Sequence, residues 1–129
     1  MPIRVELIPD AVKDLQDCQK SGFFDQFLVK LLRLEEIGND AGLPLGGALA
    51  RAQSGLHKII VGDRTWRIVY RSHHQDTVAT VLAIAKRDDA AVYELAARRL
   101  ATLGGSPETL TLAAALRIIL SPTKQRKRQ

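Results

Sequence analysis

The sequence predicts an α+β fold: a small, mostly antiparallel β-sheet packed on an N-terminal helix hairpin, with additional C-terminal helices. Two observations lead to this class. Residues 57–85 hold apolar, β-branched runs separated by polar turn residues, which is typical of consecutive antiparallel strands. Residues 9–37 show apolar positions at helical spacing, interrupted by Ser21-Gly22, which indicates two helices joined by a very short turn.

The N-terminal third begins with a strand. Residues 3–8 alternate apolar and charged side chains, as expected for a strand with one buried face. Pro9 ends this strand and suits the first turn of a helix that reaches about residue 20. The second helix is expected over residues 23–37. The glycine-rich residues 38–55 are predicted to be a loop that connects it to the sheet.

A β-hairpin and a third strand follow. Residues 56–61 and 65–71 flank Gly62-Asp63, a dipeptide that favours a tight turn. The β-branched and apolar run over residues 77–85 is typical of a central strand.

Period 2 assigns the side chains of the second hairpin strand to opposite faces of the sheet. Trp66, Ile68 and Tyr70 are apolar enough to form the core face against the helices. Arg67 and Arg71 would then lie on the open face.

Two further helices are expected near the C-terminus. Asp88 or Asp89 can cap a helix over about residues 90–103. Ser106-Pro107-Glu108 is typical of a helix start, so a final helix is expected from there to about Leu120. That helix is apolar on nearly all sides and should pack against its own domain, a second copy or a partner.

Length and composition are those of one soluble domain, with 129 residues, 46% of them hydrophobic and 26% charged. The single cysteine excludes an internal disulfide framework and fits a reducing compartment. The N-terminal residues lack the apolar segment of a signal peptide. The longest apolar run, residues 112–120, is far short of the roughly 20 residues that span a bilayer. A cytoplasmic location without membrane contact is expected.

The net charge of +5 is unevenly distributed. Residues 1–40 carry five Lys/Arg against eight Asp/Glu, residues 51–99 carry nine against five, and residues 100–129 carry five against one. Such segregation indicates an anionic partner on one face, and RNA is the working hypothesis. The cations in and around the predicted strands are Lys58, Arg64, Arg67, Arg71, Lys86 and Arg87.

Several kinds of chemistry lack their motifs. The three histidines and one cysteine do not form a zinc-ligand set, and His73-His74 suit a solvated turn. No phosphate-binding GxxxxGK[ST] loop, Ser-His-Asp order or nucleophile elbow is present. No metal and no other cofactor is therefore expected.

The segment GLHKIIVGDRTWRIVYR, followed by VLAIAKRD and VY, resembles the RelE/ParE superfamily, the toxins of bacterial toxin–antitoxin pairs. The resemblance covers about residues 3–100, and its most specific parts are the hairpin and the KRDD…VY junction. It implies a toxin domain at residues 1–103 and a C-terminal helical extension with a basic tail at residues 104–129.

RelE-like members cleave mRNA in the ribosomal A site, and their catalytic positions are matched here by Lys58, Arg67, Arg87 and Tyr93. The resemblance implies attack of a ribose 2′-OH on the adjacent phosphate, with arginines stabilising the charge and Tyr93 stacking on or orienting a base. Lys58 could act as the base only if neighbouring cations and burial lower its pKa well below about 10.4. Ile60 departs from the pattern, because RelE has a second lysine there that is a candidate general base. Further RNA contacts are assigned to Arg64, Arg71 and Lys86.

Three functions stay open from the sequence. The first is a RelE-type mRNA interferase that is neutralised by a cognate antitoxin in a hetero-oligomer. The second is a ParE-like inhibitor of DNA gyrase without nuclease activity. The third is a non-toxic interaction module in which the apolar last helix and the basic tail bind a partner.

Overall fold

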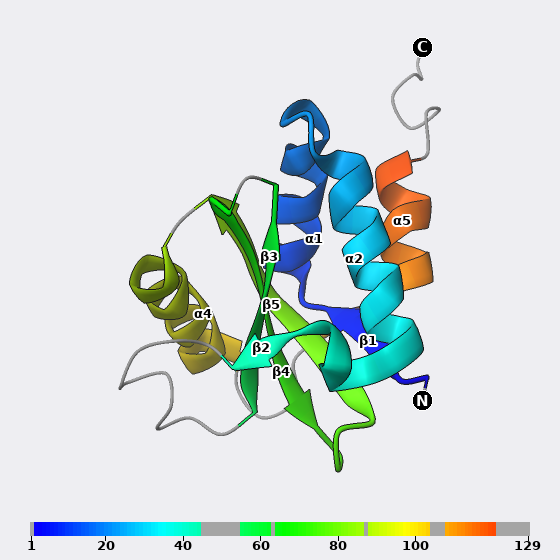
Figure 1. The fold of residues 1–129 in the computed structure, drawn as a ribbon, viewed down its shortest axis with the longest axis vertical. Helices are drawn as coiled ribbons and strands as arrows, with labels where there is room; N and C mark the ends of the chain where they lie inside the picture. Colours follow the sequence, from blue (N-terminus) through cyan, green and yellow to red (C-terminus); the bar gives the residue numbers. More distant parts are fainter. Residues whose placement is uncertain (1, 45–54, 63, 87, 104–107, 121–129) are drawn as a thin grey trace.

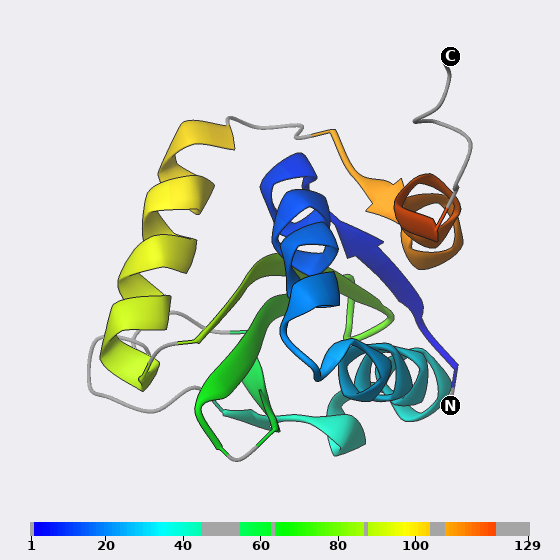
Figure 2. The same ribbon diagram turned by 90° about the horizontal axis from the view of Figure 1, so that it is seen from above.

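A mixed six-stranded sheet organises the part of the chain that the computed structural model describes, residues 2–44, 55–62, 64–86, 88–103 and 108–120. The strand order is β2-β3-β4-β5-β1-β6, and helices cover both faces of the sheet (Figures 1 and 2). The predicted α+β class is therefore confirmed.

The strands are β1 (Arg4–Leu7), β2 (Leu43–Pro44), β3 (Leu56–Val61), β4 (Trp66–His73), β5 (Val78–Lys86) and β6 (Leu110–Thr111). The helices are α1 (Pro9–Asp17), α2 (Phe24–Ile37), α4 (Asp89–Leu103) and α5 (Leu112–Leu120), and 3₁₀ turns follow α1 at Cys18–Lys20 and α2 at Gly38–Ala41.

The three central strands lie where the sequence predicts them. β3 and β4 form an antiparallel hairpin, and β4 pairs in turn with β5. β1 lies parallel to β5, while the short strands β2 and β6 pair antiparallel at the two edges. β2 falls within the predicted loop over residues 38–55. A two-residue edge strand has no periodicity from which it could be recognised.

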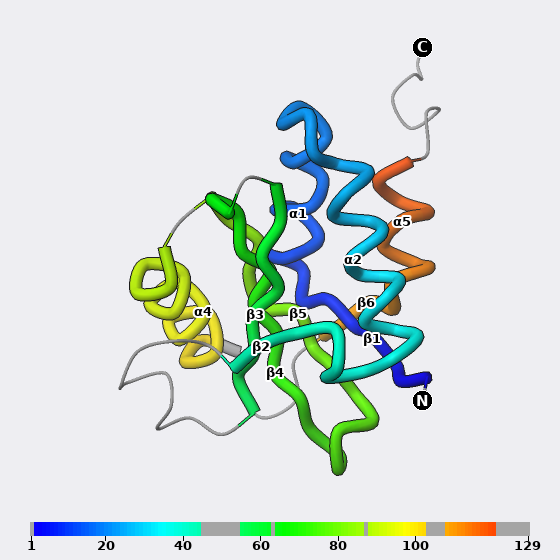
Figure 3. Tube along the Cα trace, viewed as in Figure 1, coloured from blue at the N-terminus to red at the C-terminus, as the bar shows by residue number. Residues whose placement is uncertain are grey.

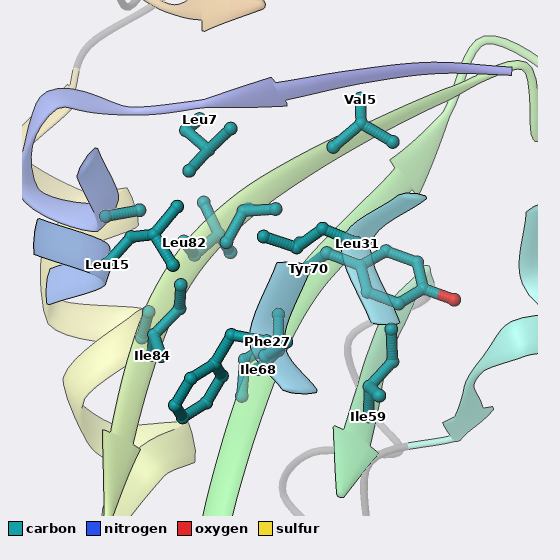
Figure 4. Close-up of a cluster of buried hydrophobic side chains, with 14 of the residues drawn as sticks. Val5, Leu7, Leu15, Phe27, Leu31, Ile59, Ile68, Tyr70, Leu82 and Ile84 are labelled. Atoms are coloured by element: carbon teal, nitrogen blue, oxygen red, sulfur yellow. The ribbon is translucent and has the colours of Figure 1, made fainter. Parts of the chain in front are cut away.

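The main core lies between the sheet and the helix hairpin α1–α2. Figure 4 shows Leu15 of α1 and Phe27 of α2 directed at the sheet, where Ile68 and Tyr70 meet them. All four side chains are fully buried. Trp66 is partly buried and packs edge-on against Phe27, with ring centroids 5.2 Å apart. The predicted core face of β4 is thus confirmed.

The opposite face of the sheet is also covered, so the prediction of an open face was wrong. Helix α4 packs on β4 and β5 (Figure 1). Val69 and Ala83 of the sheet are fully buried, and so are Val92 and Ala96 of the helix. The physical reason is that β4 carries apolar residues on both of its faces. Helix α4 also has an apolar stripe, which it buries against the second face. Arg71 remains exposed at the end of this face.

The start of the last helix also differs from the prediction. Residues 104–107 lie outside the described part of the chain, and residues 110–111 form β6 rather than the first turn of a helix. Figure 3 shows β6 beside β1, whose edge it extends. α5 begins only at Leu112, where the Thr111 hydroxyl accepts a hydrogen bond from the Ala114 amide at 3.1 Å. Sheet pairing and this cap together outweigh the helix-start pattern.

α5 packs against its own domain. It contacts β1 and α1, and its residues Leu112, Ala115 and Ile119 are buried. The basic tail that follows, residues 121–129, lies outside the described residues.

An ion pair between α1 and α4 hydrogen-bonds two backbone groups of β5 where that strand is irregular. Leu82 is an extra residue of β5, because Val69 pairs with Ala83 and Tyr70 with Val81. The Leu82 carbonyl accepts a hydrogen bond from Arg99 Nη1 at 2.9 Å, and the Ile84 amide donates to Asp14 Oδ2 at 3.0 Å. Arg99 also donates to both oxygens of Asp14, at 2.6 and 3.2 Å. Two backbone groups at the irregularity are thereby satisfied by side chains.

Replacing Asp14 by alanine should therefore lower the free energy of unfolding by about 2–4 kcal/mol, because a mostly buried guanidinium loses its carboxylate partner and a strand amide loses its acceptor. Urea unfolding at neutral pH measures the change. Asp17→Ala, at an exposed position of the same helix, is the matched control and should cost far less. Equal losses for the two variants would contradict the role given to Asp14.

Candidate functional site

The candidate site lies where the β3–β4 hairpin meets the first turn of α4. Lys58 of β3 pairs with Val69, and Arg67 of β4 pairs with Ile60. Residues opposite each other in an antiparallel pair share a face, so Lys58 and Arg67 are diagonal neighbours on the face that α4 covers. The sheet register thus brings together two of the predicted catalytic residues.

Asp89, in the first turn of α4, joins these two cations. Lys58 Nζ donates a hydrogen bond to Asp89 Oδ2, and Arg67 Nε donates to Asp89 Oδ1 at 2.8 Å. The side chains of Lys58 and Arg67 are each 14% exposed, and that of Asp89 is 25% exposed. The three groups form a partly buried cluster with a net charge of +1.

The pKa of Asp89 reflects two opposing effects. Burial alone would raise this pKa, because it disfavours the charged carboxylate. The hydrogen bonds from Lys58 and Arg67, together with their positive charges, outweigh burial and lower the pKa below its usual value. The carboxylate is therefore ionised at neutral pH.

The neighbouring Asp88 has a different task. Its Oδ1 accepts a hydrogen bond from the Ala91 amide at 2.8 Å, and its carbonyl accepts one from the Val92 amide at 3.0 Å. Asp88 is thus the N-cap of α4. Because Asp88 caps the helix, the Asp89 side chain can reach the sheet instead.

A cavity of about 370 Å³ opens beside Arg67. Arg67 Nη1 donates to the Arg64 carbonyl at 2.5 Å. Arg64 itself has a φ of +78°, in the left-handed region that costs a non-glycine residue of order 1 kcal/mol. The volume falls within the range of pockets that hold small ligands. Its lining is formed by Arg64, Thr65, Arg67, Lys86 and Asp88.

This lining is suited to an anion. Three of its residues are cations, and the charge of Asp88 is the only opposing one among the lining residues of the described chain. A guanidinium offers parallel N–H donors that match two phosphate oxygens. The cavity therefore has the charge, the donors and the size for a phosphate-bearing group.

The remaining predicted site residues are placed as follows. Tyr93 lies one helical turn after Asp89 on the same side of α4 and is partly buried against the core. Arg71 pairs with Leu56 at the other end of the hairpin, four residues or roughly 13 Å along β4 from Arg67. Arg87 lies outside the described residues.

The histidines make other contacts. His73 Nε2 lies 2.7 Å from the Thr80 hydroxyl, and the His57 ring stacks on Tyr70 with centroids 5.3 Å apart. Over the described residues, no group of three or more His, Cys, Asp or Glu side chains is placed to hold a metal ion. None of the helices in the described part of the chain is long and apolar enough to cross a membrane.

Sequence reasoning missed Asp89 as a member of the site. The sequence indicates Asp89 only as a possible helix cap, because capping is a local property that can be recognised in the sequence. The one available sign was its position in KRDD, directly after the cations of the predicted site.

The pairing predicts how stability depends on pH. A carboxylate whose folded-state pKa is lowered contributes stability above its unfolded pKa, about 3.9 for aspartate, and loses it as the pH falls through the folded-state value. Asp89→Asn should therefore be less stable than the wild type at pH 7, and this difference should shrink below about pH 4. Urea unfolding at pH 7 and pH 3 tests this, with Glu94→Gln, at an exposed position of α4, as the control. A difference that stays constant with pH would show that the negative charge of Asp89 adds no stability.

Comparisons with known proteins were made by sequence and by structure. No family model and no curated protein matches the sequence. The structure is similar to a double mutant of the Escherichia coli toxin RelE in the free state, with 23% identity and a TM-score of 0.57 over 78% of this chain and 99% of that chain. The isolated E. coli RelE toxin gives 20% identity and a TM-score of 0.52 over the same shares. A toxin–antitoxin complex, RelBE2 from Mycobacterium tuberculosis, gives 22% identity and a TM-score of 0.42 over 67% and 100%. The chain therefore has the fold of the RelE toxins.

Proposed function

We propose that this chain is the toxin of a type II toxin–antitoxin system and that it cleaves ribosome-bound mRNA without a metal. The observation that carries the proposal is the cluster of cations at the junction of the β3–β4 hairpin and α4, where Arg64, Arg67 and Lys86 line one cavity. Lys58 joins this cluster through Asp89. The RelE fold supports the same function.

The proposed reaction is attack of a ribose 2′-OH on the adjacent phosphate, which yields a cyclic phosphate and a free 5′-OH. Negative charge builds on the phosphate oxygens as the pentacoordinate state forms. Arg67 is held by Asp89 and by the Arg64 carbonyl, so its guanidinium is already oriented for that charge. Such preorganised donors stabilise a transition state more than mobile ones do.

Lys58 contributes as a cation in this proposal. Its ammonium group donates a hydrogen bond to Asp89, and a charged lysine has no lone pair with which to accept a proton. In this proposal Lys58 is therefore not the general base. Tyr93 would stack on or orient an RNA base from its position one turn along α4. Arg87 keeps the charge-stabilising role that the resemblance implies.

The proposed partners are the ribosome, its mRNA and a cognate antitoxin that neutralises the toxin in a hetero-oligomer. Two features of the sequence and site favour an RNA partner: the net charge of +5 and the cationic cavity. The antitoxin is implied by the resemblance to RelE.

A second candidate function is inhibition of DNA gyrase without cleavage. The observation that favours it is Ile60, an apolar residue opposite Arg67 where RelE-like members have a second lysine. A site without that lysine could bind a target and leave it intact.

Expression of the chain alone distinguishes the two functions. The wild type should stop growth and produce cleaved ribosome-bound mRNA. Arg67→Ala should reduce the cleavage rate about 10²–10³-fold, because it removes a preorganised charge from the transition state. Arg33→Ala is the matched control, since Arg33 is exposed on α2, which packs on the other face of the sheet, and it should leave cleavage unchanged.

Growth arrest that Arg67→Ala does not relieve, together with inhibited supercoiling by purified gyrase, would reject the nuclease and favour the second function.

A further inference from the structure

The site needs a proton acceptor that its cations cannot supply. A ribose 2′-OH must lose its proton as it attacks phosphorus. Arg64, Arg67 and Lys86 are donors only, and Lys58 donates to a carboxylate. Ile60 has no polar group to offer.

Three nearby side chains of the described chain could accept a proton, and one of them is hydrogen-bonded to both Lys58 and Arg67. Asp88 lines the cavity, and its side chain caps α4 through the hydrogen bond from the Ala91 amide. His57 precedes Lys58 on β3 and therefore points to the opposite face of the sheet, where it stacks on Tyr70. Asp89 remains.

We propose that Asp89 is the general base that removes the proton from the attacking 2′-OH, an inference that rests on the proposed nuclease function. From the described part of the chain, each of its carboxylate oxygens accepts one hydrogen bond, one from Lys58 and one from Arg67. An ionised carboxylate has about four acceptor positions on its two oxygens, so acceptor capacity remains. The side chain is 25% exposed, which leaves it accessible from solvent.

The proton and electron balance of this step is complete. The 2′-OH proton passes to an oxygen of Asp89, and the 2′-oxygen forms its bond to phosphorus. The bond from phosphorus to the 5′-oxygen breaks, and the 5′-oxygen leaves with the electron pair and takes a proton from water. Asp89 then releases its proton to solvent, and nothing is oxidised or reduced.

The two cations control the proton affinity of Asp89. Without substrate, Lys58 and Arg67 keep it ionised, and their hydrogen bonds lower its proton affinity. A phosphate that accepts from the same two donors withdraws part of that stabilisation, which raises the proton affinity of Asp89 when the 2′-OH is in place. The carboxylate thereby takes over the task of the lysine that is missing at Ile60.

Single-turnover cleavage of mRNA bound to ribosomes tests the role of Asp89, with the full-length purified chain. Asp89→Asn should slow cleavage about 10²–10⁴-fold, the usual contribution of a general base, while the Kd for an RNA whose riboses are 2′-O-methylated stays within a few-fold of the wild-type value. Glu94→Gln, exposed on the same helix, should cleave like the wild type.

Chemical rescue separates catalysis from a structural effect. Asp89→Ala should regain part of its cleavage rate in formate, which supplies a carboxylate, and none in the same concentration of chloride. Absence of rescue, or loss of RNA binding together with cleavage, would overturn the inference and make the role of Asp89 structural.

The remaining outcomes are also decisive. Cleavage by Asp89→Asn that equals or exceeds the wild-type rate would show that Asp89 only competes with phosphate for Lys58 and Arg67. A wild type that binds ribosomes but cleaves no mRNA would overturn the nuclease function itself, and the base with it.

Discussion

The pairing of Asp89 with Lys58 and Arg67 is the interaction on which the rest of the site depends. Two partly buried cations on neighbouring strands repel each other, and each would be costly to bury without a counter-ion. A carboxylate from the start of α4 resolves both problems, and its negative charge suits the positive end of that helix. One contact therefore fixes the start of α4 against the sheet and arranges the groups that would bind a phosphate.

The second ion pair, between Arg99 and Asp14, fixes the same helix near its other end. It uses the irregularity in β5, where the backbone groups of Leu82 and Ile84 accept and donate side-chain hydrogen bonds. Between the two ends, Val92 and Ala96 are buried against the sheet. A helix held in this way can keep charged groups near a reacting phosphate in fixed positions, and such preorganisation is the largest single contribution in many enzymes.

Periodicity in the sequence is sufficient to predict those features of the fold that depend on one helix or strand alone. The alternation around Ile68 predicts the core face of β4, and the apolar stripe around Phe27 predicts α2. The burial of Val69 under α4 could not be predicted in the same way, because it depends on an element that follows later in the chain. β6 was missed because two residues carry no period and a helix-start pattern precedes them. The same reason applies to the site: Asp89 lies 31 residues from Lys58 and 22 from Arg67, and only the tertiary structure brings them together.

The central claim is that the cations joined by Asp89 bind an RNA phosphate. The side-chain Nε–H resonances of arginine in an NMR spectrum test this claim most directly. Arg67 donates this hydrogen to Asp89 in the free protein, so its resonance reports any exchange of that partner. Titration with a short 2′-O-methylated RNA, which cannot be cleaved, should shift the Arg67 resonance and leave that of Arg33 unchanged. Saturable binding of the RNA with no change at Arg67 would contradict the account.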